Sequence, residues 1–226
     1  MKLRVSCEHA LFKALLLCGT LGAVPGHAAS LAPVEEEKII FIRHGEKPAA
    51  GLGLLNCQGL NRALALPATL LARFGRPDFI FAPDPSQQKT DAGHLYNYVR
   101  PFLTVAPLAV QLGLPVNTAF GYADIEGLQA ELATPAYHQA VVLVAWEHKE
   151  IEALVKAMLQ RLGGQISEVP HWKGRDFDRI YVLTVRRGAG QTTARFALEH
   201  EALDGQSIVC PTAAPLPPTA PLPQTP

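Results

Sequence analysis

The residues best suited to chemistry in this chain are Arg43 and His44, which directly follow the apolar run 39–42. An imidazole can act as a nucleophile, and a neighbouring guanidinium offers a fork of donors that matches phosphate oxygens. Gly45 lets the backbone turn tightly after a buried strand. Ligands of open α/β sheets bind beyond the carboxyl ends of the strands. The pattern therefore predicts a phosphate site, with His44 as nucleophile and Arg43 as an oxygen ligand.

A second apolar run, residues 141–146, is followed by Glu147 and a second histidine, His148. The amphipathic pattern over 148–162 predicts a helix that begins at this residue. A helix N-terminus favours a bound anion, so we expect His148 to bind the same phosphate. Glu147 would repel a phosphate unless it is paired, and we expect it to orient a neighbour. Lys47 is expected to add positive charge at the phosphate or at the leaving group.

Alternating strand-like and helix-like segments must position these residues. Such alternation predicts an α/β fold, a three-layer α/β/α sandwich with a mostly parallel central sheet. The last two strands follow each other without a helix, which predicts a hairpin at one edge. Pro67 and Pro107 are expected to kink or split their helices. The expected strands are 38–43, 78–81, 140–146, 179–186 and 193–198, and the expected helices are 59–74, 101–112, 125–132 and 148–162.

The two ends of the chain differ from its middle. Residues 1–28 combine a basic start, a short apolar run and small residues at 26–28, which predicts a secretory signal peptide. About 11 apolar residues are too few to span a bilayer. Residues 211–226 hold seven prolines and predict a disordered tail. The chain therefore divides into a signal peptide, a domain over 29–210 and a tail, with a periplasmic or secreted location.

Composition narrows the partners. After loss of residues 1–28, 17 basic and 19 acidic residues remain, so there is no basic field to recruit nucleic acid. Only Cys57 and Cys210 remain, and they either pair in an oxidising compartment or lie apart as buried thiols. The other histidines, His138, His171 and His200, have no companions at metal-ligand spacing. The sequence specifies no oligomeric state.

The tetrad Arg43-His44-Gly45-Glu46 resembles the signature of the histidine phosphatase superfamily, which includes phosphoglycerate mutase-like enzymes and histidine acid phosphatases. Further parts follow in family order: a helix led by Gly59, an arginine with a threonine four residues on, and the strand that ends at His148. The resemblance implies a phosphomonoester hydrolase that forms a phosphohistidine on His44 and acts on a small phosphorylated substrate. It implies no metal and no cofactor, because arginines and histidines supply the positive charge.

The resemblance also assigns the second arginine of the phosphate site. The family carries it soon after the second strand, but residues 82–89 contain none. We therefore assign Arg100, which has Thr104 four residues on, with Lys89 as the rival cation. Residues 83–99 then form an enlarged loop at the pocket mouth that selects the substrate. Its aromatic residues are candidates to line the pocket, namely His94, Tyr96 and Tyr98.

The general acid and the remaining ligands follow from looser matches. Asp124 is the first choice for the acid and Glu126 the second, although both also suit the start of a helix. Glu46 is expected to bind substrate together with Lys47. Arg62 is a candidate third phosphate ligand, and a surface arginine is the competing interpretation.

Two alternatives to hydrolysis remain open. A protein of this fold that kept the anion pocket and lost activity would bind phosphorylated ligands without turnover. A phosphoglycerate mutase-type phosphoryl transfer is the less favoured alternative, because an exported protein would not meet cytosolic phosphoesters.

Overall fold

A six-stranded sheet with the order β5-β2-β6-β1-β7-β8 forms the centre of the protein. The computed structural model describes residues 34–211, so the expected signal peptide and residues 212–226 of the expected tail lie outside the described part. The strands of the sheet are β1 (Glu35–Arg43), β2 (Phe79–Phe81), β5 (Val116–Asn117), β6 (Val141–Trp146), β7 (Arg179–Gly188) and β8 (Gln191–His200).

The strand directions bring the functional segments to one edge. β1 runs parallel to β6, with Ile39 opposite Val142, and β2 runs parallel to β6 and to β5. β7 is antiparallel to β1 and pairs with β8 as a hairpin. The carboxyl ends of β1, β2 and β6 therefore lie at the same edge, where ligands of such sheets bind. The mostly parallel sheet and its edge hairpin confirm the prediction from the sequence.

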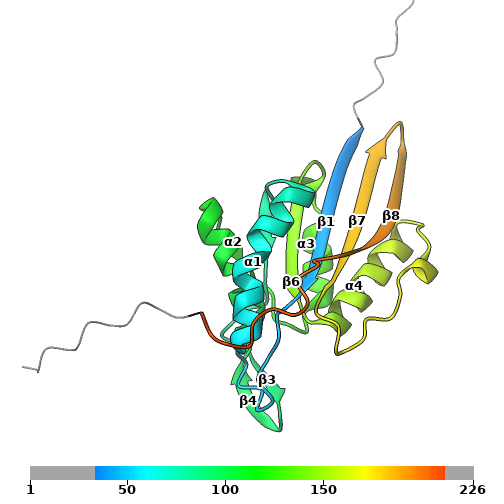
Figure 1. Cartoon of the computed structure of the whole chain (residues 1–226). Helices are drawn as coiled ribbons and strands as arrows, with labels where there is room; N and C mark the ends of the chain where they lie inside the picture. The colour runs from blue at the N-terminus through cyan, green and yellow to red at the C-terminus, as the bar shows by residue number, and fades with distance from the viewer. Residues whose placement is uncertain (1–33, 212–226) are drawn as a thin grey trace, which may run out of the picture. The chain divides into compact units, whose positions relative to one another are not determined.

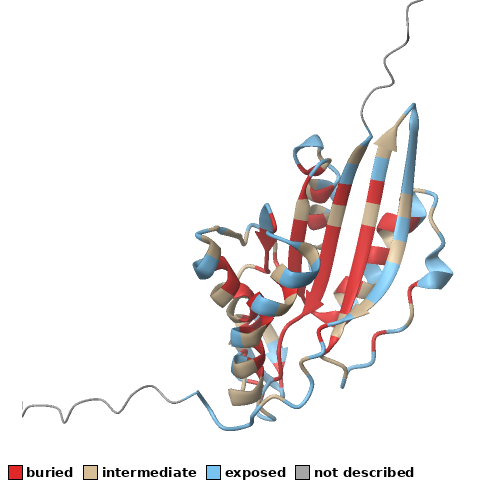
Figure 2. Cartoon of the chain, turned by 45° about the horizontal axis from the view of Figure 1, so that its top comes forward, coloured by how far each residue is buried: buried red, intermediate tan, exposed pale blue. Residues whose placement is uncertain are grey.

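Helices cover both faces of the sheet (Figure 1). On one face, α1 (Cys57–Phe74) and α2 (Arg100–Leu112) pack side chains such as Leu66 and Leu108 on Ile40 and Ile42. On the other face lie α3 (Ile125–Leu132) and α4 (His148–Arg161). Successive β1 residues alternate between these two cores because strand side chains alternate in direction. Figure 2 shows the central strands as the buried layer. The fold is thus the expected α/β/α sandwich.

Two features of the helices and loops differ from expectation. Pro67 and Pro107 lie inside α1 and α2, and neither helix is split. A proline removes one hydrogen bond, and here the packing of each helix on the sheet preserves its continuity. The loop 83–99 contains a hairpin of β3 (Gln88–Asp91) and β4 (His94–Asn97). Ala92 and Gly93 form its turn with positive φ values of 51° and 85°, as tight two-residue turns require.

A disulfide closes the chain on itself. Cys57 and Cys210 are bonded, so the pairing alternative holds and that of two separate thiols does not. Asn61 Nδ2 adds hydrogen bonds of 2.8 Å to the carbonyls of Ser207 and Val209. The segment after β8 is thereby fixed along α1. In residues 34–211, no helix is both long and apolar enough to cross a membrane.

Candidate active site

His44 follows the last residue of β1 and is only 3% exposed. Its Nδ1 lies 2.8 Å from the Gly45 carbonyl oxygen, which only accepts hydrogen bonds, so Nδ1 carries the proton. Nε2 is then left with the lone pair of the neutral ring. Burial, together with the positive charges of Arg43 and Arg100, holds the pKa of His44 well below 6.5. The ring is therefore a neutral imidazole at neutral pH.

Arg43 is fixed by the loop that precedes β7. One terminal nitrogen donates to the carbonyls of Gly174 and Asp176, at 2.7 and 2.9 Å, and the guanidinium carbon lies 3.8 Å from the centre of the Phe177 ring. Burial lowers the pKa of Arg43 to about 10, against the opposing effect of Glu147. Arg43 thus remains a cation at neutral pH, and its position is set by backbone acceptors.

Arg100 is the first residue of α2, and the spacing to Thr104 has a structural purpose. The Thr104 hydroxyl accepts from the Gly45 N–H at 3.0 Å and donates to the Arg100 carbonyl at 2.8 Å. This bridge joins the turn after His44 to the first turn of α2. Asp91 of β3 accepts from Arg100 at 2.5 Å and also pairs with Lys47. The hairpin therefore holds both cations at the site.

His148 is the first residue of α4 and is 7% exposed. Its Nδ1 lies 2.7 Å from Glu147 Oε1. The other carboxylate oxygen of Glu147 caps the helix by accepting from the backbone N–H groups of Lys149 and Glu150. Burial opposes ionisation of Glu147, but His148, Lys89 and the Lys149 N–H together lower its pKa to about 2. Glu147 is thus a paired carboxylate that orients its neighbour, as expected.

These groups line one open pocket of about 600 Å³ at the carboxyl edge of the sheet. The structure brings together Arg43, His44, Arg100 and His148 there, with Lys47 beside them. Five cationic and three acidic side chains line the pocket, a balance that suits an anion. A hollow of about 690 Å³ against β1, β7 and β8 is larger, but its lining contains no histidine and none of these residues.

The expected general acids, Asp124 and Glu126, do not line this pocket. Asp124 caps α3 by accepting from the Gly127 N–H at 3.0 Å, and Glu126 lies in the first turn of the same helix. Both line a hollow of about 440 Å³ that adjoins the pocket, because Glu150 lines the two. The acidic turn in the sequence marks the start of a helix, where carboxylates are favoured by the helix dipole.

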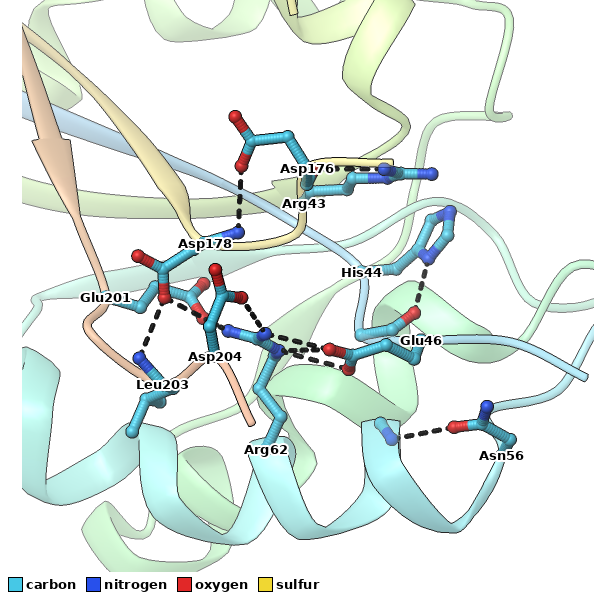
Figure 3. A network of polar contacts seen from close by, with 12 residues as sticks. Arg43, His44, Glu46, Asn56, Arg62, Asp176, Asp178, Glu201, Leu203 and Asp204 are labelled. Atoms are coloured by element: carbon cyan, nitrogen blue, oxygen red, sulfur yellow. Dashed lines mark hydrogen bonds and ion pairs between the residues drawn. The ribbon is translucent and has the colours of Figure 1, made fainter. Parts of the chain in front are cut away.

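Arg62 and Glu46 are also absent from the pocket lining, and Figure 3 shows them bound to each other. Arg62 is fully buried and binds Glu46 through two nitrogens at 2.8–3.1 Å. It also donates to Glu201 at 2.6 Å and to Asp204 at 2.9 Å. Arg62 is thus neither a phosphate ligand nor a surface residue, and Glu46 is its partner. The pair ties the turn after β1 to α1 and to the segment after β8.

Several pocket residues were not predicted for this site. Asp91 comes from the hairpin of β3 and β4. The turn at Gly93 was the feature of the sequence that could have predicted this hairpin. Glu150 and Lys149 follow His148 on α4, and Tyr122 precedes α3. Of the aromatic residues expected from the loop, Tyr98 is buried, with its ring centre 6.1 Å from that of His44. His94 is exposed, and neither it nor Tyr96 lines the pocket.

No group of three or more His, Cys, Asp or Glu residues in the described part of the chain is arranged to hold a metal ion. The positive charge that faces the pocket comes from its two arginines and three lysines.

No protein-family model matches this chain, and no curated protein matches it either. Solved structures do resemble it. A candidate phosphohistidine phosphatase, SixA, from Nakamurella multipartitia is 18% identical, with a TM-score of 0.49 over 73% of this chain and 96% of that one. A mycobacterial glucosyl-3-phosphoglycerate phosphatase, solved with inorganic phosphate, is 18% identical, with a TM-score of 0.46 over 71% of this chain and 95% of that one.

A phosphoglycerate mutase from Plasmodium falciparum is 14% identical, with a TM-score of 0.46 over 71% of this chain and 89% of that one. All three belong to the histidine phosphatase superfamily, which the Arg-His-Gly-Glu tetrad resembles. At such identities and TM-scores the likeness assigns no activity, so the function has to follow from the pocket itself.

Proposed function

We propose that this protein hydrolyses phosphomonoesters through a phosphohistidine on His44. The observation that carries the proposal is the buried, neutral His44, whose free Nε2 shares an anion-binding pocket with Arg43, Arg100 and His148. A site that only bound phosphate would gain from cations and would have no need for a neutral imidazole.

In the first step, His44 Nε2 attacks phosphorus, and the bond between phosphorus and the ester oxygen breaks. Arg43, Arg100 and His148 stabilise the charge on the phosphoryl oxygens. Nδ1 of His148 lies beside Glu147, and in this proposal Nε2 of the same ring binds the phosphoryl group. The products of this step are a phosphohistidine and the leaving alkoxide oxygen, which becomes an alcohol when it takes up a proton.

The proton comes from Glu150 in this proposal. Three carboxyl groups line the pocket. Asp91 accepts from both Lys47 and Arg100, and Glu147 binds His148 and two backbone N–H groups, so the pKa of each is lowered. Burial and the nearby charge of Glu147 instead raise the pKa of Glu150. Glu150 is therefore the pocket carboxyl best able to carry a proton.

In the second step, water attacks phosphorus, the bond to Nε2 breaks, and the ionised Glu150 accepts a proton from the water. Inorganic phosphate leaves, and both His44 and Glu150 return to their starting states. In this cycle Glu150 donates and regains the proton, and His44 accepts and releases the phosphoryl group.

An exported location is part of the proposal. The Cys57–Cys210 disulfide supports it, because such bonds persist in oxidising compartments. The basic and apolar pattern of residues 1–28 points in the same direction.

The test is hydrolysis of 4-nitrophenyl phosphate in EDTA by the wild type and by His44→Ala. We expect turnover in the wild type and a loss of at least ~10³-fold in the variant, since the variant lacks the atom that attacks phosphorus in this proposal. Brief reaction with a ³²P-labelled substrate, followed by denaturation, should leave label bound to the protein. The label should be stable to base and labile to acid, as a phosphohistidine is.

Turnover that persists in His44→Ala would contradict the proposal. If the wild type shows no turnover while inorganic phosphate still binds and protects it from thermal unfolding, the pocket binds phosphorylated ligands without hydrolysing them. Arg100→Gln should abolish the binding of inorganic phosphate, because it removes a buried cation of the pocket.

A further inference from the structure

Lys89 is a cation of the pocket that does not come from the strand ends or helix starts that carry the other site residues. It lies on β3 of the inserted hairpin. Its Nζ is 4.9 Å from the centre of the Tyr98 ring and 4.6 Å from that of the Tyr122 ring. Two aromatic faces thus hold the ammonium group in place and leave it partly desolvated.

The other cations are mostly engaged. Lys47 and Arg100 both pair with Asp91, and Arg43 donates to two backbone carbonyls. Within residues 34–211, no carboxylate forms an ion pair with Lys89. Burial, opposed by Glu147 and aided by Arg100, lowers the pKa of Lys89, as expected for a positive charge that is incompletely compensated.

The pocket has space beyond a phosphate group. Its volume of about 600 Å³ is in the range of pockets that hold drug-sized ligands, roughly 300–1,000 Å³. The part of the lining that Arg43, His44, Arg100 and His148 do not occupy includes Lys89, Thr90 and Tyr122. The alcohol portion of the substrate would contact these residues.

We propose that Lys89, held by Tyr98 and Tyr122, forms a subsite for a second anionic group on the substrate. The preferred substrates are then phosphomonoesters whose alcohol portion carries a carboxylate or a further phosphate. This inference rests on the proposed function, because it places the phosphoryl group at His44. It gives the inserted hairpin a role in selecting the substrate.

The experiment compares three substrates that share one aromatic scaffold: 4-carbamoylphenyl phosphate, 4-carboxyphenyl phosphate and 4-phosphonophenyl phosphate. We expect Lys89→Met to lower kcat/KM about tenfold for the charged substrates, the effect of losing one charge-assisted hydrogen bond. The neutral carbamoyl substrate should change less than about twofold. Methionine keeps the apolar stem that packs on the two rings. Whichever charged substrate loses more identifies the second group as carboxylate or phosphate.

The control is Lys156→Met, which removes a lysine that pairs with Glu152 on α4, outside the pocket lining. An equal loss for all three substrates would place Lys89 at the transferred phosphoryl group and overturn the inference. No loss for any of them would overturn it too.

His44→Ala separates this inference from the proposed function. If the carbamoyl substrate is hydrolysed only when His44 is present, the proposed hydrolysis is supported, whatever the result for Lys89→Met. Calorimetric binding of 4-carboxyphenylphosphonate and 4-carbamoylphenylphosphonate tests the subsite without turnover. Equal affinities in the wild type would overturn the inference, and a preference for the carboxylate that Lys89→Met removes would support it.

Discussion

Protonation at the site is set residue by residue, through burial and neighbouring charge. His44 is kept neutral first by burial and then by the charges of Arg43 and Arg100, which disfavour a positive charge on its ring. Glu147 and Glu150 lie three residues apart on the same helix start, yet their pKa values shift in opposite directions. Glu147 meets an imidazole and backbone donors, whereas the pKa of Glu150 is raised first by burial and then by the negative charge of Glu147. Two neighbouring carboxyl groups whose pKa values are shifted apart can take different roles, one as a proton donor and the other as a permanent anion.

Glu150→Gln should show how strongly the leaving group needs a proton. We expect hydrolysis of an alkyl phosphate to fall by about 10²–10³-fold, within the usual range for loss of a general acid. Hydrolysis of 2,4-dinitrophenyl phosphate, whose leaving group needs no proton, should change little. Because the protonated form is the active one, wild-type activity on the alkyl substrate is lost as pH rises through the Glu150 pKa. That basic limb should vanish in the variant.

Asp124→Asn and Glu126→Gln are the matched controls for Glu150. Both residues lie beside Glu150 in the adjoining hollow, but neither lines the pocket that contains His44. Neither should change the dependence of the rate on the leaving group. A selective loss on the alkyl substrate in either variant, with Glu150→Gln unaffected, would return the acid to the turn before α3.

Two elements, the turn after β1 and the start of α1, meet through glycines. A Cβ on Gly59 would overlap the Glu46 carbonyl oxygen and lie 2.6 Å from the Glu46 nitrogen. A Cβ on Gly45 would lie 2.9 Å from the Gly59 carbonyl oxygen. Asn56 supports the same contact, because its side chain caps α1 at the Gly59 N–H and its own N–H donates to the Glu46 carbonyl. The approach of α1 thus fixes the turn that carries His44.

Gly59→Ala tests this contact. Alanine in a helix is favoured over glycine by about 1 kcal/mol, so propensity alone predicts stabilisation. We expect instead a net destabilisation of about 1–3 kcal/mol, because the methyl group meets backbone that cannot move aside. The rate with 4-nitrophenyl phosphate should fall as well. Urea unfolding and the rate assay measure the two effects.

Leu64→Ala on the exposed face of α1 is the control for Gly59→Ala. Leu64 is 52% exposed, so its substitution should change the free energy of unfolding by about 0.5 kcal/mol or less. Unchanged or increased stability in Gly59→Ala would show that α1 can shift away from the turn.

Over the whole molecule, the segment after β8 returns to the site end of the sheet and is fastened to α1. Arg62 joins Glu46 near the nucleophile to Glu201 and Asp204 of this segment (Figure 3). Burial raises the pKa of Glu201 to about 8, against the opposing charge of Arg62. The disulfide fastens the same segment nine residues further on, at Cys210.

Removing the disulfide should destabilise the protein without removing the site. Cys57 and Cys210 are 153 residues apart, and a cross-link that closes so long a loop typically stabilises a protein by about 2–4 kcal/mol. We therefore expect Cys57→Ser/Cys210→Ser to lower Tm by roughly 5–15 °C, at about 2–4 °C per kcal/mol for a chain of this size. Calorimetry on the two proteins measures the shift.

A reducing agent serves as the internal control for the disulfide. It should lower the Tm of the wild type toward that of the double variant and leave the variant unchanged. Equal Tm values for the oxidised wild type and the double variant would show that the Arg62 contacts alone secure the segment.

Local pattern was enough to predict the order of the main strands and helices, because hydrophobic periodicity follows directly from residue types. It also placed His44 and His148 at strand ends, and a parallel sheet brings such ends together. Arg100 depended on its spacing to Thr104, which a hydrogen-bonded bridge to Gly45 explains.

Only the tertiary structure decided which charged residues face the pocket. Arg62 and Glu46 are near His44 in sequence but bind each other, and Arg62 also binds carboxylates more than 100 residues away. Asp124 and Glu126 have the right chemistry but lie at the start of a helix that lines the adjoining hollow, and of the residues in that hollow only Glu150 also lines the pocket. Asp91, Lys89 and Glu150 enter the pocket because a hairpin and a helix end project into it. The direction of a side chain depends on packing between distant segments, and that information is not local to any motif.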